Sequence, residues 1–168
     1  MNIITLGLFV VYKGFYSSYN ILFHMNFKIL NSNQKKKIIN YLEEQYDLKG
    51  LKLDYIFVEK NDKIYLLSNK FKDFELCNLH INSLGVYFIK KDRLSIEGSQ
   101  IIGKIAQKNV VDIDKSQTEK WVRGEDLNVE GDYSGYVIIK HKNDFYGCGS
   151  YKENIIKNFV PKDRRIKT

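Results

Sequence analysis

The run GYVIIKHKNDFYGCGSY (135–151) decides the fold of the C-terminal half of this chain. Its flanks, 135–140 and 144–151, are rich in β-branched and aromatic residues, and the three polar residues between them suit a turn, so the run predicts a β-hairpin. Residues 155–160 predict one further strand, which ends at Pro161 because proline cannot donate a ladder hydrogen bond.

The hairpin contains Gly147, Cys148 and Gly149. This triplet is too short for a dinucleotide-binding fingerprint, and it lies within a hairpin rather than between a strand and a helix. We therefore expect the glycines to let the strand bulge or to let another backbone approach closely.

Upstream, residues 31–46 have the apolar spacing of an amphipathic helix, with Asn31 or Ser32 as its cap. Residues 55–59 and 63–68 predict a second hairpin. The run 79–90 predicts a longer strand, bent or bulged at Gly85.

After Arg93 the pattern predicts a short helix beginning after Ser95 or Glu97, and then a buried strand over 109–113. Residues 116–123 predict another short helix, with Ser116 as cap, Glu119 in capping-box position and Gly124 as terminator. Short helices alternate with strands, which disfavours a doubly wound sheet. The predicted fold class is α+β: a small N-terminal α/β subdomain followed by a mixed β-barrel, or pseudobarrel, with short helices.

The composition is that of a globular protein: 168 residues, 43% hydrophobic and 14% aromatic, with one proline and hence little room for a flexible linker. The formal charge of +7 favours polyanionic partners, although charge alone does not separate nucleic acid from a membrane surface or from ordinary solubility. Two cysteines, Cys77 and Cys148, fit a reducing cytoplasm, so we expect a cytoplasmic protein.

The first 24 residues contain a single charge, Lys13, and differ from everything that follows. They lack the basic start and cleavage site of a signal peptide, and the apolar run 3–12 is shorter than the roughly 20 residues needed to span a bilayer. We interpret residues 1–24 as an extension upstream of a start at Met25. If the extension is translated, we expect an apolar surface or an edge strand rather than a membrane anchor.

The sequence offers little catalytic chemistry. Cys77, His80, His141 and Cys148 are the candidate metal ligands, but we expect buried cysteines and ordinary histidines, with no metal and no cofactor. There is no phosphate-binding loop and no nucleophile elbow of the G-x-S-x-G kind in the sequence. No active site is predicted.

The C-terminal end is strongly basic, with eight basic against three acidic residues between positions 140 and 168. Aromatic residues are interleaved with these charges, and single-stranded or looped RNA binds surfaces that combine cations for phosphates with rings for unstacked bases. We expect these cations to gather on one face of a small barrel. Most of the rings should fill the core, and Tyr151 is the first candidate for an exposed one.

Four segments, WVRGEDL (121–127), GYVIIK (135–140), FYGCG (145–149) and KNFVPKDRR (157–165), resemble in sequence and order the PUA-like RNA-binding domain at the C-terminus of RsmF-type (Sun family) RNA cytosine-5 methyltransferases. Members of that family often have Gly-Trp-Gly where this chain has a cysteine at 148. The N-terminal half resembles, more loosely, the small α/β domain that precedes PUA domains in some ribosome-biogenesis factors.

Together with the extension (1–24), the resemblance implies two further regions: a small α/β pre-PUA-like domain (25–78) and a PUA-like RNA-binding domain (79–168). It implies a non-catalytic RNA-binding protein that acts in rRNA or tRNA modification or ribosome biogenesis. The methyltransferase reaction needs a Pro-Cys motif, a second cysteine and a cofactor-binding domain, whereas the one proline here precedes Lys162.

The expected partners are rRNA or tRNA and a separate RNA methyltransferase or ribosome-assembly factor, without a membrane. The implied RNA-binding residues are Arg123, Tyr151, Lys152, Lys157, Asn158, Lys162, Arg164 and Arg165. Trp121 is expected in the core, and Arg123 could instead neutralise a helix C-terminus. The alternative is a protein-interaction or accessory subunit of an RNA methyltransferase or ribosome-assembly complex that does not contact RNA itself.

Overall fold

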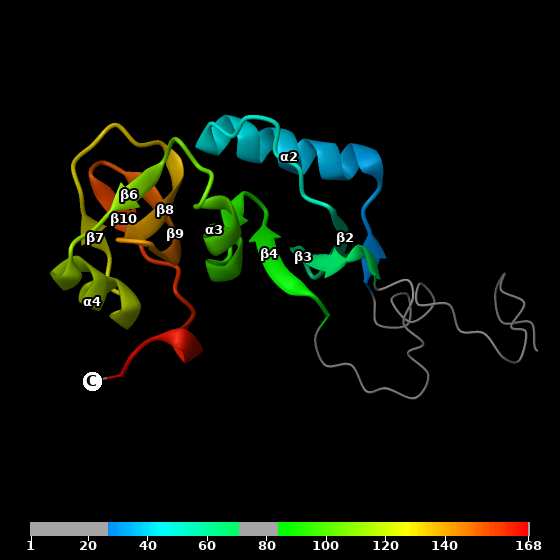
Figure 1. Cartoon of the computed structure of the whole chain (residues 1–168). Coiled ribbons are helices and arrows are strands. Elements are labelled where there is room, and N and C mark those ends of the chain that lie inside the picture. The colour runs from blue at the N-terminus through cyan, green and yellow to red at the C-terminus, as the bar shows by residue number, and fades with distance from the viewer. Residues whose placement is uncertain (1–26, 71–83, 168) are drawn as a thin grey trace, which may run out of the picture.

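A computed structural model describes residues 27–70 and 84–167, which form two five-stranded sheets with three helices (Figure 1). The N-terminal extension, Cys77, His80 and the start of the strand expected at 79–90 lie outside the described residues. The α+β fold class is confirmed.

The first sheet is antiparallel throughout and has the strand order β1-β2-β3-β4-β5. Its central hairpin is the predicted one, and the turn at Asn61 and Asp62 has positive φ at both residues, which matches the twist of the flanking strands. The strands are β1 (Lys28–Ile29), β2 (Tyr55–Lys60), β3 (Lys63–Ser68), β4 (Val86–Lys90) and β5 (Arg93–Leu94).

The second sheet curls into a mixed half-barrel with the strand order β6-β8-β9-β10-β7. β6 pairs parallel to β8, and the remaining pairs are antiparallel. The predicted C-terminal hairpin is β8 with β9, and the expected strand after it is shorter than predicted. The strands are β6 (Val110–Asp112), β7 (Leu127–Asn128), β8 (Gly135–His141), β9 (Asp144–Lys152) and β10 (Ile155–Lys157).

Helix α2 (Ser32–Tyr46) follows β1 and precedes β2 in the chain, and it lies along one side of both sheets (Figure 1). It starts at Asn31, whose side chain accepts a hydrogen bond from the Gln34 N–H at 2.9 Å, as the first of the two expected caps. Near its other end, the Gln45 amide donates to the carbonyls of Ser134 and Tyr136, at 2.7 and 2.9 Å. These contacts fix the position of the second sheet relative to the helix.

The two shorter helices are α3 (Ile96–Ile102) and α4 (Lys115–Arg123). α3 begins at Ser95 as predicted, whereas α4 begins at Asp114 and not at Ser116. Asp114 and Gln117 form the capping box, because the Asp114 carboxylate accepts from the Gln117 N–H at 2.7 Å. The expectation of a cap at Ser116 with Glu119 is therefore wrong by two residues.

One hydrophobic core is shared by both sheets. Phe57 and Phe88 from the first sheet lie in the same buried cluster as Ile138 and Cys148 from the second, with Tyr46 of α2 among them. α3 packs between β4 and β9 (Figure 1). The predicted domain boundary near residue 79 stays a proposal. The strands that precede and follow residues 71–83 in the chain, β3 and β4, are hydrogen-bonded to each other in the first sheet.

Gly147 and Gly149 of β9 have the roles expected from the sequence, a bulge in the strand and a close approach of other groups. Gly147 has φ +111° and lies opposite a register shift in β8. A methyl group on Gly149 would lie 2.9 Å from the Trp121 ring and 2.8 Å from the Lys157 carbonyl oxygen. Gly149 thus lets the fully buried Trp121 pack closely against the sheet, and Trp121 is a core residue as expected.

The segment after β10 is held by the side chain of Asn158, which is buried. Its amide donates to the carbonyls of Trp121 and Glu125, at 2.8 and 3.0 Å, and its carbonyl oxygen accepts from the Val160 N–H at 2.7 Å. Further along, the Ile166 N–H donates to the Val122 carbonyl. The C-terminal segment, which includes the 3-10 turn η2 (Lys162–Arg164), is thereby attached to α4.

Within the described residues, no helix has both the length and the apolar character needed to cross a membrane.

Replacing Asn158 with Ala should lower the free energy of unfolding by at least about 2 kcal/mol, because buried carbonyls and an amide lose their partner. Chemical denaturation measures this. Asn128→Ala, at an exposed position of β7, is the matched control and should change stability by less than about 0.5 kcal/mol. Equal effects of the two substitutions would contradict the anchoring role of Asn158.

Burial raises the pKa of the Cys148 thiol to about 12, from an ordinary value of 9.0. In a Cys77→Ser background, N-ethylmaleimide should therefore leave the folded protein unlabelled at pH 8 and label it fully in denaturant. The thiol's contribution to stability should be complete below pH 9 and decline between pH 9 and 12, where only the unfolded thiol ionises. Rapid labelling of the folded protein would show that Cys148 is accessible.

Candidate functional site

Two hollows lie next to each other where the C-terminal segment meets the first sheet and α3. The larger has a volume of about 620 Å³ and the smaller about 270 Å³. Both are lined by Ile96, Val160 and Arg164, so they share a wall. We call the two hollows together the groove.

The smaller hollow is built from both sheets and contains two pairs of a cation and a ring. The Arg93 guanidinium lies 4.4 Å from the centre of the Phe159 ring, and the Lys63 ammonium lies 5.3 Å from that of Tyr87. Burial raises the pKa of Tyr87, and the neighbouring Arg93 partly offsets this. The lining of the hollow thus carries three cations, Lys63, Arg93 and Arg164, and two acids, Glu97 and Asp163, beside aromatic surface.

The larger hollow lies over α3 and the turn between β8 and β9. Phe145 and Tyr146 are half-buried in its wall, and Lys104 contributes an exposed ammonium. Gln100 and Asn143 add exposed amide groups, which can both donate and accept hydrogen bonds. This lining combines rings, two cations (Lys104 and Arg164), neutral polar groups and one carboxylate, Asp144.

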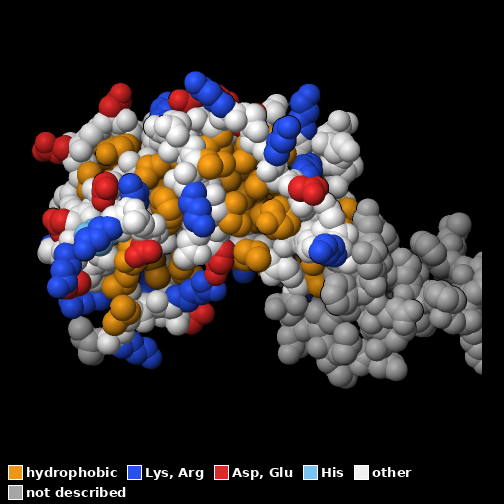
Figure 2. Space-filling view, viewed as in Figure 1, with side chains coloured by type: hydrophobic (Ala, Val, Ile, Leu, Met, Phe, Trp, Pro, Cys, Tyr) orange, Lys and Arg blue, Asp and Glu red, His pale blue; other side chains and the backbone are white. Residues whose placement is uncertain are grey.

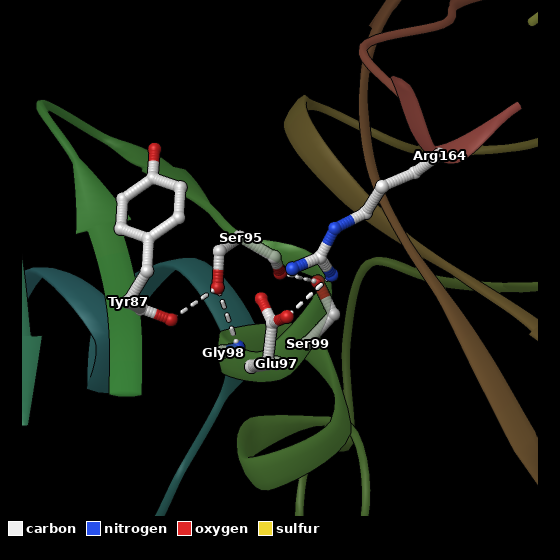
Figure 3. A network of polar contacts seen from close by, with 6 residues as sticks. All are labelled: Tyr87, Ser95, Glu97, Gly98, Ser99 and Arg164. Atoms are coloured by element: carbon white, nitrogen blue, oxygen red, sulfur yellow. Dashed lines mark hydrogen bonds and ion pairs between the residues drawn. The ribbon is translucent and has the colours of Figure 1, made fainter. Parts of the chain in front are cut away.

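Arg164 stands on the wall between the hollows and reaches from the C-terminal segment to α3, where its guanidinium forms an ion pair with Glu97 (Figure 3). Their side chains are 51% and 29% exposed, respectively. Burial alone would raise the pKa of Glu97, but the hydrogen bond from Arg164 and further hydrogen bonds outweigh it and hold that pKa below its usual value. Glu97 is therefore ionised at neutral pH.

The start of α3, on which Glu97 lies, is rigidly held. The Ser95 hydroxyl donates to the Tyr87 carbonyl at 2.6 Å and accepts from the Gly98 N–H at 2.8 Å (Figure 3). The Ser99 hydroxyl donates to the Ser95 carbonyl at 2.8 Å. Hydrogen bonds to β4 and within the first turn of α3 thus fix the position of Glu97 next to Arg164.

The predicted RNA-binding residues divide into two groups. Arg164 is in the groove, and Lys162 is exposed in the same 3-10 turn. Arg123 is exposed in the last turn of α4, where a cation also favours the helix dipole. Lys157 is exposed in β10, and Lys152 forms an exposed ion pair with Glu153 at 3.4 Å.

The other three predicted contacts are engaged within the protein. Asn158 uses its whole carboxamide to anchor the C-terminal segment, which leaves it no group for RNA. The Arg165 Nε donates to the Val160 carbonyl at 3.0 Å. Tyr151 is half-buried, with its hydroxyl donating to Gly131 and its ring edge-on to Tyr133, so little of the ring is left to stack on a base.

The basic side chains do not form one continuous patch. Lys142 precedes β9 and Lys152 is its last residue, a separation of at most roughly 30 Å at the rise of an extended strand. On the face drawn in Figure 2, basic side chains are spread over both halves and stand among acidic ones. The groove is thus characterised by two pairs of a cation and a ring rather than by a high density of charge, and two further pairs, Lys35 with Phe57 and Lys60 with Phe27, lie outside it.

Sequence reasoning missed Lys63, Tyr87 and Arg93, which complete the smaller hollow from the first sheet. Arg93 follows a tight turn between β4 and β5 and carries no motif. Only the packing of the two sheets brings it onto Phe159.

Of the candidate metal ligands, His141 donates from Nδ1 to the Ile113 carbonyl at 2.6 Å and Cys148 is buried. In the parts of the chain that the structure describes, no three His, Cys, Asp or Glu side chains are grouped to hold a metal ion.

Comparison with known proteins gives a match to the family model described as the methyltransferase RsmF PUA domain, over residues 108–166. The chain is 28% identical over 112 residues to ribosomal RNA small subunit methyltransferase F of Vibrio vulnificus (strain YJ016), covering 64% of this chain and 23% of that protein. It is 37% identical over 54 residues to the protein of the same name from Vibrio cholerae serotype O1 (strain M66-2), covering 32% of this chain and 11% of that protein.

The chain therefore spans about a quarter of the length of these relatives at most. The first alignment is longer than the segment matched by the family model, so the similarity extends beyond that segment. Within it lie the half-barrel sheet, α4 and the C-terminal segment with Arg164. Residues 108–166 are thus a PUA domain of the kind found in the rRNA methyltransferase RsmF.

Proposed function

We propose that this chain is a non-catalytic RNA-binding protein of the cytoplasm that acts in rRNA or tRNA modification or in ribosome biogenesis, and that RNA lies along the groove. One observation carries the proposal: the PUA segment supplies most of the lining of the larger hollow, and Arg164 and Phe159 of the smaller one. PUA domains typically bind RNA. In the groove, Arg164 and aromatic side chains of the PUA segment therefore lie beside further cations of the first sheet.

The charges of the C-terminal segment also support the proposal that RNA binds along the groove. Lys157 and Lys162 are exposed, and neither forms an ion pair with any residue in the described part of the chain. Exposed lysines contact phosphates at little desolvation cost and release counterions from RNA when they bind. They would attract and orient the polynucleotide, while the groove holds it more closely.

The proposal of a non-catalytic role rests on thiol chemistry. The reaction of the methyltransferases that the chain resembles requires reactive cysteines, and Cys148 is buried with its pKa raised to about 12. The only proline, Pro161, precedes Lys162 rather than a cysteine. A separate catalytic subunit, or a ribosome-assembly factor, would then act on the RNA that this protein holds.

RNA binding is tested with labelled bulk tRNA and fragmented rRNA over a range of salt concentrations. The slope of log affinity against log salt should fall in magnitude by about 0.7–0.9 for each phosphate that a variant no longer neutralises, so Lys157→Gln combined with Lys162→Gln should flatten it measurably. The matched control is Lys36→Gln with Lys37→Gln, two exposed lysines of α2.

Equal slopes for the two double variants would remove Lys157 and Lys162 from the interface. Failure of the wild-type protein to bind either RNA, together with a protein partner that remains bound after nuclease treatment, would favour an accessory subunit that does not touch RNA.

A further inference from the structure

We infer that the groove binds two consecutive unstacked nucleotides of single-stranded RNA, with Arg164 on the phosphate that joins them and Glu97 occupying that phosphate's place in the free protein. This inference rests on the proposed function and specifies the kind of RNA and the residues that read it.

The arrangement of the hollows fits two adjacent nucleotides. Their volumes of about 620 and 270 Å³ lie within or near the roughly 300–1,000 Å³ of sites that enclose small ligands. Since they share the wall formed by Ile96, Val160 and Arg164, a chain passing from one hollow to the other crosses Arg164. The group of RNA that lies between two bases is a phosphate, and the guanidinium binds a phosphate with two parallel hydrogen bonds.

The smaller hollow suits an unstacked base because the Arg93 guanidinium can stack on the base. The central carbon of its guanidinium lies over the Phe159 ring, 4.4 Å from the ring centre, and this contact restrains the side chain. Bases that leave the stack are bound on rings and on arginine planes alike. Lys63, over Tyr87, adds a cation next to that position.

The larger hollow suits the second base. Gln100 and Asn143 present neutral amides that can bind the edge of a base, and Lys104 can reach its phosphate. Base edges of an A-form duplex are engaged in pairing, and its deep groove does not admit side chains. Single-stranded or looped RNA is therefore the form that can use both hollows.

Glu97 supplies the second, independent observation. Its carboxylate already accepts a hydrogen bond from the Arg164 guanidinium across the wall between the hollows (Figure 3). A carboxylate and a phosphate present the same anionic oxygens to arginine. Glu97 thus keeps Arg164 extended over the groove, and an RNA phosphate must displace Glu97 to bind.

The test measures the affinity of the full chain for a labelled random-sequence RNA hexamer and for an RNA duplex without single-stranded ends. The hexamer should bind more tightly. Arg164→Gln should weaken hexamer binding about tenfold, as expected for the loss of a charge-assisted hydrogen bond, and Arg93→Gln should weaken it several-fold. Lys36→Gln on α2 is the charge-matched control and should change affinity less than twofold.

Glu97→Gln gives the decisive result, because it should increase hexamer affinity about three- to tenfold, and a misfolded variant cannot produce an increase. Its control is Asp163→Asn, which removes the same charge from the lining of the smaller hollow without touching the Arg164 ion pair. An equal gain from both variants, or no gain from Glu97→Gln, would overturn the inference.

The two proposals fail in different ways. If the wild-type chain binds neither tRNA, rRNA nor the hexamer, the RNA-binding function itself is wrong. If it binds tRNA or rRNA with a salt dependence but binds duplex as well as hexamer, or if the groove variants behave as Lys36→Gln does, only the dinucleotide site is wrong. Tight binding of an acidic peptide in place of the hexamer would assign the groove to a protein partner.

Discussion

The position of the C-terminal segment depends on the hydrogen bonds of one buried side chain, Asn158. Its carboxamide joins the carbonyls at the end of α4 to the backbone of Val160, so the chain turns back across α4 after β10 rather than continuing away from the sheet. This turn brings Phe159 beneath Arg93 and extends Arg164 toward α3. Without the anchor, the groove would lose one wall and its central cation.

A second constraint is the core that the two sheets share. Because Phe57 and Phe88 pack in the same cluster as Ile138, the first sheet helps to support the second sheet. The same packing places Lys63, Tyr87 and Arg93 at the edge of the C-terminal segment. Residues 108–166 alone would therefore lack half of the lining of the smaller hollow, which comes from the first sheet and α3.

Local features were predictable from the sequence, and the groove was not. Both hairpins and the Asn31 and Ser95 caps follow from residue types a few positions apart, whereas α4 contains two overlapping capping patterns, and its start was placed two residues late. Asn158 is a polar residue that directly follows Lys157, a pattern typical of the surface, yet it is buried. Contacts such as Arg93 with Phe159 join distant parts of the chain through sheet packing, for which no local pattern exists.

The most direct test of the account is to locate the RNA on the protein. Ultraviolet crosslinking of the full chain to a single-stranded RNA, followed by mass spectrometry of the peptides, reports which aromatic side chains lie against bases. The account predicts crosslinks at the rings that line the groove, Tyr87, Phe145, Tyr146 and Phe159. Crosslinks confined to α2 or to the outer edge of the second sheet would contradict it.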